Sequence, residues 1–119
     1  MANLHEDMVK DLVKPGREIL NMLAPSEVNM IHMCLGLSGE VGELVDAIKK
    51  SVIYNQNMDM ENVIEELGDI EFYMEGLRQQ LSISREQVLE ANILKLRKRY
   101  QNGYSDKAAQ ARADKNSGE

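Results

Sequence analysis

Apolar residues recur at steps of three and four along most of the chain, which is the period of an amphipathic α-helix. One such segment runs from Ser26 to about Ile53, and a second from Asp59 to about Leu81. The second has the alternating steps of a helix-bundle seam. Between them, Asn55 to Asn57 interrupts the pattern, and Asp59 can cap a new helix. The pattern predicts two long antiparallel helices with a turn near residues 54–55.

Shorter helices are expected on both sides of this hairpin. Asn3-x-x-Glu6 has the spacing of a capping box for a helix that Pro15-Gly16 should end or bend. Pro25-Ser26 then opens the first long helix. Ser84-x-x-Gln87 can cap a helix beyond the hairpin, which Asn102-Gly103 should end. No stretch of useful length alternates like a strand, so the predicted fold class is all-α, a helical bundle built on a long antiparallel helix hairpin.

Length and composition indicate one domain. The 119 residues suffice for a single core, which we expect over residues 1–104. Residues 105–119 are polar and rich in Ala, Lys and Asp, so we expect a C-terminal tail there, either mobile or ordered as a strap on a partner subunit. The lone Cys34 lies in an apolar run and is expected to be a buried small hydrophobe in a reducing compartment.

Charge and hydropathy narrow the range of partners. The formal net charge of −6 disfavours binding to nucleic acid or anionic lipid, and a phosphate-bearing ligand would need a metal ion to offset the repulsion. No apolar stretch reaches membrane-spanning length, and the first residues lack the basic start of a secretory signal. We therefore expect a cytoplasmic protein with no nucleic-acid or membrane partner.

Two short acidic pairs carry the candidate chemistry. They are Glu40-x-x-Glu43 on the first long helix and Glu66-x-x-Asp69 on the second. A spacing of three places both carboxylates of a pair on one helix face. In an antiparallel hairpin, residues at the same height have numbers with a constant sum, and Glu40 with Asp69 has the same sum as Glu43 with Glu66. Four carboxylates therefore converge, and such a cluster repels itself unless cations or protons neutralise it.

The donor set points to a particular kind of metal. Oxygen-only ligands suit a hard divalent cation, so we predict a magnesium site, with manganese as a substitute. A di-iron carboxylate bundle would normally use Glu-x-x-His pairs, and neither His5 nor His32 lies three residues after a glutamate. The plain alternative is a solvated acidic face, with Lys49 and Lys50 nearby.

The residues around the acidic pairs resemble the signature of the MazG-like all-α nucleoside triphosphate pyrophosphohydrolases. The resemblance extends from about His32 to Tyr104. Its motifs read Gly36-Leu37-Ser38-Gly39-Glu40-Val41-Gly42-Glu43-Leu44, then Glu65-Glu66-Leu67-Gly68-Asp69-Ile70, and later Glu90-Ala91-Asn92-Ile93-Leu94-Lys95-Leu96-Arg97-Lys98-Arg99-Tyr100. Many relatives have two adjacent acids in the first motif, whereas Gly39 precedes Glu40 here.

The resemblance implies a reaction and a set of catalytic residues. A nucleoside triphosphate, ribo or deoxy, would be cleaved between its α- and β-phosphates to the monophosphate and pyrophosphate. The implied catalytic magnesium ligands are Glu40, Glu43, Glu66 and Asp69. A metal ion would neutralise and orient the phosphates, and a second metal or a free carboxylate could activate water. The first three of these acids are all candidates for the general base.

A basic face on the helix after the hairpin is the candidate substrate contact. Asn92, Lys95 and Arg99 fall at i, i+3 and i+7 and so share one side. By resemblance, Lys95 and Arg99 contact phosphates, and Asn92 contacts a phosphate or the sugar. Lys49, two turns beyond Glu43, is a further candidate phosphate contact. The plain alternative is a solvated basic surface.

Gly36, Gly39 and Gly42 recur every third residue inside the first long helix, where each costs about 1 kcal/mol relative to alanine. They can permit close helix approach or leave room for a nucleotide beside the acids. We favour helix packing.

The exposed seam of a long hairpin also predicts self-association, and the family usually works as a dimer or tetramer, so we expect a homodimer or homotetramer. Two other functions stay open. One is a relative specialised for dUTP or another single nucleotide. The other is a catalytically silent helical module that binds nucleotide or protein.

Overall fold

The computed structural model describes residues 2–115, and in that range the chain forms helices and no strand. The helices are α1 (Ala2–Leu12), α2 (Gly16–Met22), α3 (Pro25–Val52), α4 (Met60–Leu81), α5 (Arg85–Arg99) and α6 (Asp106–Ala111). The predicted all-α class is confirmed. Within the described range, no helix combines the length and apolar content that crossing a membrane requires.

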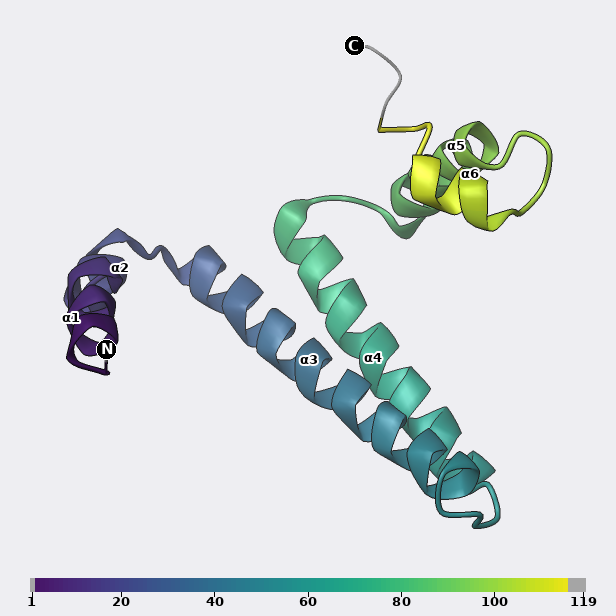
Figure 1. Cartoon of the computed structure of the whole chain (residues 1–119), viewed down its shortest axis with the longest axis horizontal. Helices are drawn as coiled ribbons and strands as arrows, with labels where there is room; N and C mark the ends of the chain where they lie inside the picture. The colour runs from purple at the N-terminus through teal and green to yellow at the C-terminus, as the bar shows by residue number, and fades with distance from the viewer. Residues whose placement is uncertain (1, 116–119) are drawn as a thin grey trace.

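The long antiparallel hairpin consists of α3 and α4, which lie side by side (Figure 1). In the connection between them, Asn55 has a φ of 54°, a left-handed conformation that asparagine tolerates in turns. Gly36 faces the ring of Tyr73 across the hairpin. Met33 faces Gly76 one turn further along. Both contacts join residues with the number sum that the acidic pairs predict, so the predicted register is confirmed.

Local caps set where these helices begin. Pro25 occupies the first turn of α3, where its missing N–H leaves no backbone hydrogen bond unmade. Asp59 caps α4 by accepting a hydrogen bond from the backbone N–H of Asn62 at 3.1 Å. Ser84 and Gln87 cap α5 reciprocally, with hydrogen bonds of 2.8 and 3.1 Å between each backbone N–H and the other's side-chain oxygen.

The predicted cap at Asn3 is wrong. Helix α1 already begins at Ala2, so Asn3 lies inside the helix. The prediction for the other end is right, because α1 ends before Pro15 and α2 starts at Gly16.

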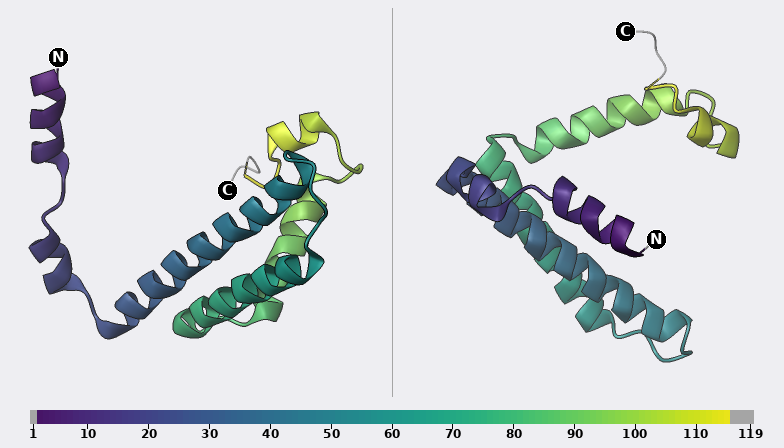
Figure 2. Two further views of the ribbon diagram at one scale, coloured as in Figure 1. Left: turned by 90° about the horizontal axis from the view of Figure 1, so that it is seen from below. Right: turned by 60° about the vertical axis from the view of Figure 1, so that its left-hand side comes forward.

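The shorter helices leave the hairpin largely uncovered. Among residues 2–115, close packing joins α3 with α4 and α5 with α6, while α1 and α2 lead away from the start of α3 (Figure 2). The radius of gyration is 20.2 Å, against roughly 13.5 Å for a compact chain of this length. Val63 and Glu66 are the only residues in the described range that are buried as a whole. Cys34, expected to be buried, is exposed.

Residues 105–115 do not form the expected mobile tail. Ser105 caps α6 by accepting a hydrogen bond from the backbone N–H of Ala108 at 3.0 Å. Helix α6 packs against α5, and Asp114 accepts a hydrogen bond from Nε of Arg99 at 2.9 Å. The segment therefore orders against its own chain, and the expected strap on a partner subunit stays a prediction. The rest of the predicted tail, residues 116–119, lies outside the described residues.

One of the three evenly spaced glycines of α3 is required by helix packing. A Cβ at Gly36 would overlap the ring of Tyr73, whereas a Cβ at Gly39 or Gly42 would have nothing within 4 Å. The predicted packing role therefore holds for Gly36. It is wrong for Gly39 and Gly42 within this chain.

We expect Gly36→Ala to lower the free energy of unfolding by about 1–3 kcal/mol, because the added methyl group forces the tyrosine ring or the helix backbone to move. Gly39→Ala should instead raise it by about 0.5–1 kcal/mol, because alanine loses less backbone entropy in an exposed helix. Urea unfolding of both variants measures the difference. Equal stability would contradict the close approach of α3 and α4 at Gly36.

Candidate metal centre

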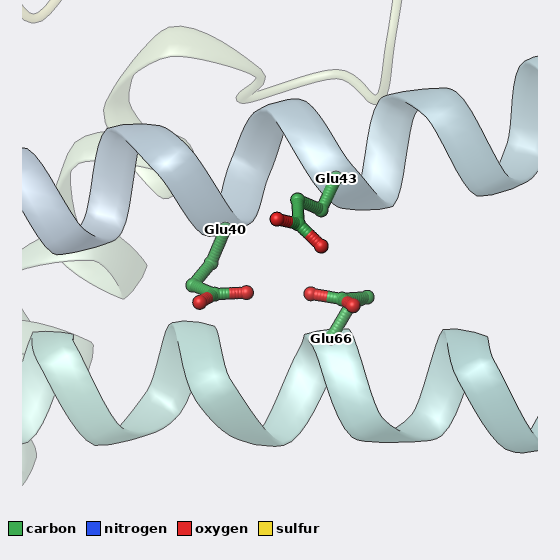
Figure 3. Close-up of side chains that lie close together, drawn as sticks. All are labelled: Glu40, Glu43 and Glu66. Carbon is green, nitrogen blue, oxygen red and sulfur yellow. The ribbon is translucent and has the colours of Figure 1, made fainter.

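Three of the four predicted acidic residues meet in the hairpin. Glu40 and Glu43 project from α3, and Glu66 projects toward them from α4 (Figure 3). One carboxylate oxygen from each residue lies within 4.8 Å of the others. Glu66 points between the two α3 carboxylates. The hairpin thus concentrates three acidic side chains at one place, as the i,i+3 spacing and the register predict.

Glu66 is the buried member of this cluster. Its side chain is 7% exposed, and its Oε2 atom is buried without a hydrogen-bond partner. Hydrogen bonding to Glu40 is the main reason that the pKa of Glu66 rises from 4.5 to about 7. Burial raises it further, as do the charges of Glu40, Glu43 and Asp69. The carboxyl group is therefore held where its ionised form is unfavourable unless a cation compensates.

These properties fit a hard divalent cation. The three residues offer carboxylate oxygens only, which magnesium and manganese prefer. The unpartnered buried Oε2 atom is the stronger indication, because a buried polar atom without a partner is costly and a bound cation would satisfy it. Glu40, Glu43 and Glu66 are therefore the residues best placed to hold a metal ion.

Among the described residues, the close group of carboxylates consists of Glu40, Glu43 and Glu66, and Asp69 does not belong to it. It lies one turn after Glu66 on α4, and it acts on Glu66 through its charge. The structure thus places the fourth predicted ligand near the cluster but not in it.

An adjoining pocket widens the candidate site. It has a volume of about 460 Å³, within the range of small-molecule sites. The surface that lines it, which we call the acidic face, comprises Gly39, Gly42, Glu43, Asp46, Lys50 and Asn62. The open glycines give this face its depth, which agrees with the alternative of room beside the acids.

Three residues of the acidic face were not singled out as site residues by the sequence. Asp46 lies three residues after Glu43, so the same i,i+3 rule that found the acidic pairs would extend to it. Asp46 forms an ion pair of 3.0 Å with Lys50. Asn62 comes from the first turn of α4, where only the folded hairpin shows its proximity to α3.

The predicted substrate residues on α5 are not brought to this cluster. Asn92 and Lys95 are exposed on a helix that leaves the end of the hairpin and packs on α6 (Figure 1). Arg99 is only 16% exposed, because its guanidinium pairs with Asp114, whose side chain is 7% exposed. This ion pair, reinforced by a hydrogen bond to Tyr100, raises the pKa of Arg99.

Lys49 lies near the tip of the hairpin, away from the three glutamates. Its Nζ atom sits 5.5 Å from the centre of the Tyr54 ring, an arrangement typical of a cation–π contact. The structure thus gives Lys49 a local partner on the connection that follows α3.

A helical hairpin whose two arms carry a shared carboxylate cluster defines a class of all-α proteins with an oxygen-ligand site. The model of the MazG nucleotide pyrophosphohydrolase domain matches residues 29–104, which is more than half of the chain and includes all of this hairpin except the first four residues of α3. The chain therefore belongs to the MazG nucleotide pyrophosphohydrolase family.

One relative is similar over a stretch of comparable length. The Gene 37 protein of Mycobacterium phage L5 is 33% identical over 78 residues, which span 60% of this chain and 67% of that protein. No solved structure matches.

The metal-free protein should lose stability as the pH rises. Because the pKa of Glu66 is about 7 in the folded state and near 4.5 in the unfolded state, the folded state keeps a proton over this range. Its contribution is complete below about pH 4.5 and disappears as the pH rises through 7. Melting temperatures measured in chelator between about pH 5 and 8 should therefore fall.

Glu66→Gln should flatten this dependence, because the amide cannot ionise. Glu71→Gln, which alters an exposed carboxylate of the same helix, is the matched control and should behave like the wild type. An equally steep decline in the Glu66→Gln protein would show that another group titrates.

Proposed function

We propose that this protein is a magnesium-dependent nucleoside triphosphate pyrophosphohydrolase that cleaves NTP or dNTP between the α- and β-phosphates. The observation that carries the proposal is the buried, unpartnered carboxylate of Glu66 facing Glu40 and Glu43, inside the segment that matches the family. The products are the nucleoside monophosphate and pyrophosphate.

The chain's own residues have distinct tasks in this proposal. Glu40, Glu43 and Glu66 hold the magnesium ion, or manganese in its place, and Asp69 contributes negative charge from one turn away. When bound, the metal ion neutralises the phosphates and orients them for attack by water. A carboxylate of the cluster that is free of the metal accepts the proton of this water. The pocket of the acidic face provides the space for a nucleotide.

The basic face of α5 supplies phosphate contacts in the complete site. Lys95 and Asn92 are exposed and available for this task. Arg99 can take part only by exchanging Asp114 for a phosphate, because the two side chains already pair. Since within residues 2–115 the close packing of α5 is with α6, α5 of a second copy is the helix that we place opposite the acidic face. The active form is thus a homodimer or homotetramer, working in the cytoplasm.

Two variants test the metal site. Glu43→Gln and Glu66→Gln should each lower kcat by a factor on the order of 100 to 1,000, because they weaken charge stabilisation at the reacting phosphates. Both should stay folded, since removing charge from a repelling cluster relieves strain. Product analysis with a panel of NTPs and dNTPs at saturating magnesium gives the rate and the reaction type.

Glu71→Gln is again the control. Near-normal turnover by folded Glu43→Gln and Glu66→Gln proteins would refute the metal-site assignment. Diphosphate and orthophosphate as first products would refute cleavage at the α,β bond. Absence of turnover in the wild type on every nucleotide would favour a silent binding module, and turnover of dUTP alone a specialised relative.

A second pair of variants tests the basic face of α5. Lys95→Ala should lower kcat/KM by roughly 10- to 150-fold, the loss of one charge-assisted phosphate contact. Arg97→Ala, which removes a charge from another side of the same exposed helix, should change it little. Melting temperatures should be similar, because solvated surface substitutions usually change stability by less than about 0.5 kcal/mol. Equal kcat/KM values for the two variants would show that the basic face of α5 has no role in substrate binding.

A further inference from the structure

The N-terminal arm, residues 2–22, carries an apolar face that no other part of residues 2–115 covers. Leu4, Met8 and Leu12 follow one another at intervals of four along α1 and are all exposed, Leu12 to 77%. Charged side chains occupy the opposite side, among them Glu6 and Lys10. The side chains of Ile19, Leu20 and Met22 in α2 are also exposed. The arm is therefore amphipathic and lacks a partner for its apolar side.

Such an arm needs a partner to keep its helical form. Helix α1 has 11 residues and α2 has 7, and isolated helices shorter than about 12–15 residues are marginal in water. The arm also precedes the segment that matches the family, which begins at residue 29. The family match therefore says nothing about the arm or about what covers its apolar side.

The arm is directed away from its own hairpin. Leu23 and Ala24 join α2 to α3 in extended conformations, with ψ values of 125° and 157°. Pro25 disfavours a helical conformation at Ala24, so the arm does not fold back from this joint. The left view of Figure 2 agrees, because α1 and α2 lead there from the start of α3 away from the hairpin.

The hairpin has an uncovered apolar surface of its own. A helix turns about 100° per residue, so residues on α3 and α4 can be assigned to one side of the hairpin or the other. The side opposite the acidic face, which we call the back face, comprises Val41, Ile48, Val52, Met60, Ile64 and Leu67. All six of these side chains are exposed.

We propose that the N-terminal arm docks on the back face of a second copy of this chain, in a reciprocal exchange about a twofold axis. Every copy carries both surfaces, so arm and back face are present in equal amounts. Docking there leaves the acidic face and its pocket open. The inference specifies the partner contact within the self-association proposed above, and it is independent of the chemistry at Glu66.

The available area favours exchange over a single contact. A fully buried aliphatic side chain removes about 60–120 Å² from water, so the eight exposed large apolar side chains of the arm offer on the order of 400 Å². One arm and the surface beneath it would bury about 800 Å², the size of crystal-packing contacts. Two exchanged arms reach about 1,600 Å², the usual size of a stable interface.

Paired serine substitutions in the full chain test the proposal by sedimentation over a concentration series. Met8→Ser with Leu12→Ser should raise the dissociation constant at least about 100-fold, because a reciprocal dimer loses four buried apolar side chains. Glu6→Ser with Lys10→Ser is the matched control, two residues earlier at the same spacing and on the opposite side of α1, and should change it less than about threefold. Unchanged association of the Met8/Leu12 variant would overturn the proposal, as would equal weakening by both pairs.

Amide hydrogen exchange of the wild type gives a second measurement that needs no variant. Exchange in residues 2–22 and in residues 60–67 should slow together as the concentration passes the dissociation constant. Arm protection that stays the same across that range would overturn the proposal and indicate docking within the chain or to another molecule. A wild-type protein that is monomeric at all concentrations would overturn both this proposal and the self-association proposed above, whereas nucleotide hydrolysis is measured separately.

Discussion

The burial of Glu66 between two packed helices is the constraint on which this molecule depends. A carboxylate that is 7% exposed and lies beside two others can be tolerated only with a proton or a cation, because an uncompensated buried charge is costly. The raised pKa of Glu66 shows the first solution in the metal-free chain. The orphaned Oε2 atom shows that a proton alone leaves part of the cluster unsatisfied. Stability of the hairpin and the proposed affinity for a cation are therefore linked at one side chain.

The geometry of the cluster follows from how closely α3 and α4 approach. Gly36 lies one turn before Glu40, and the ring of Tyr73 fills the space where a side chain would stand. A larger residue there would push the helices apart and with them the carboxylates that face each other across the hairpin. Gly39 and Gly42 act differently, because they face an open pocket and not a helix. The three evenly spaced glycines thus have two roles. Gly36 permits the close packing of the helices, whereas Gly39 and Gly42 keep the pocket open.

The sequence predicts well whatever depends on helical period and on antiparallel register. Both long helices, their caps and the meeting of Glu40, Glu43 and Glu66 follow from spacing alone. For Arg99, spacing does not predict the ion pair that the structure shows. Its partner Asp114 lies 15 residues later, beyond a turn in which Gly103 has a φ of 84°, and the polar composition of that segment hides the short helix that returns it. Local periodicity contains no information about such a return, so Arg99 could not be distinguished from its solvated neighbours.

The helical period predicts that an apolar stripe will be covered. It does not predict whether the same chain or another copy covers it. This explains why Cys34, which sits in an apolar run, is exposed in a single chain. Helix α3 carries more apolar surface than α4 can cover, because one neighbouring helix occupies only one side of a cylinder. The radius of gyration of 20.2 Å, larger than that of a compact chain of this length, is also consistent with apolar surfaces that the chain does not pack together. A sequence that places apolar residues on two sides of a hairpin and on its flanking helices therefore has more apolar surface than these helices can cover, and the acidic face, which no large apolar residue lines, is the surface suited to a polar ligand.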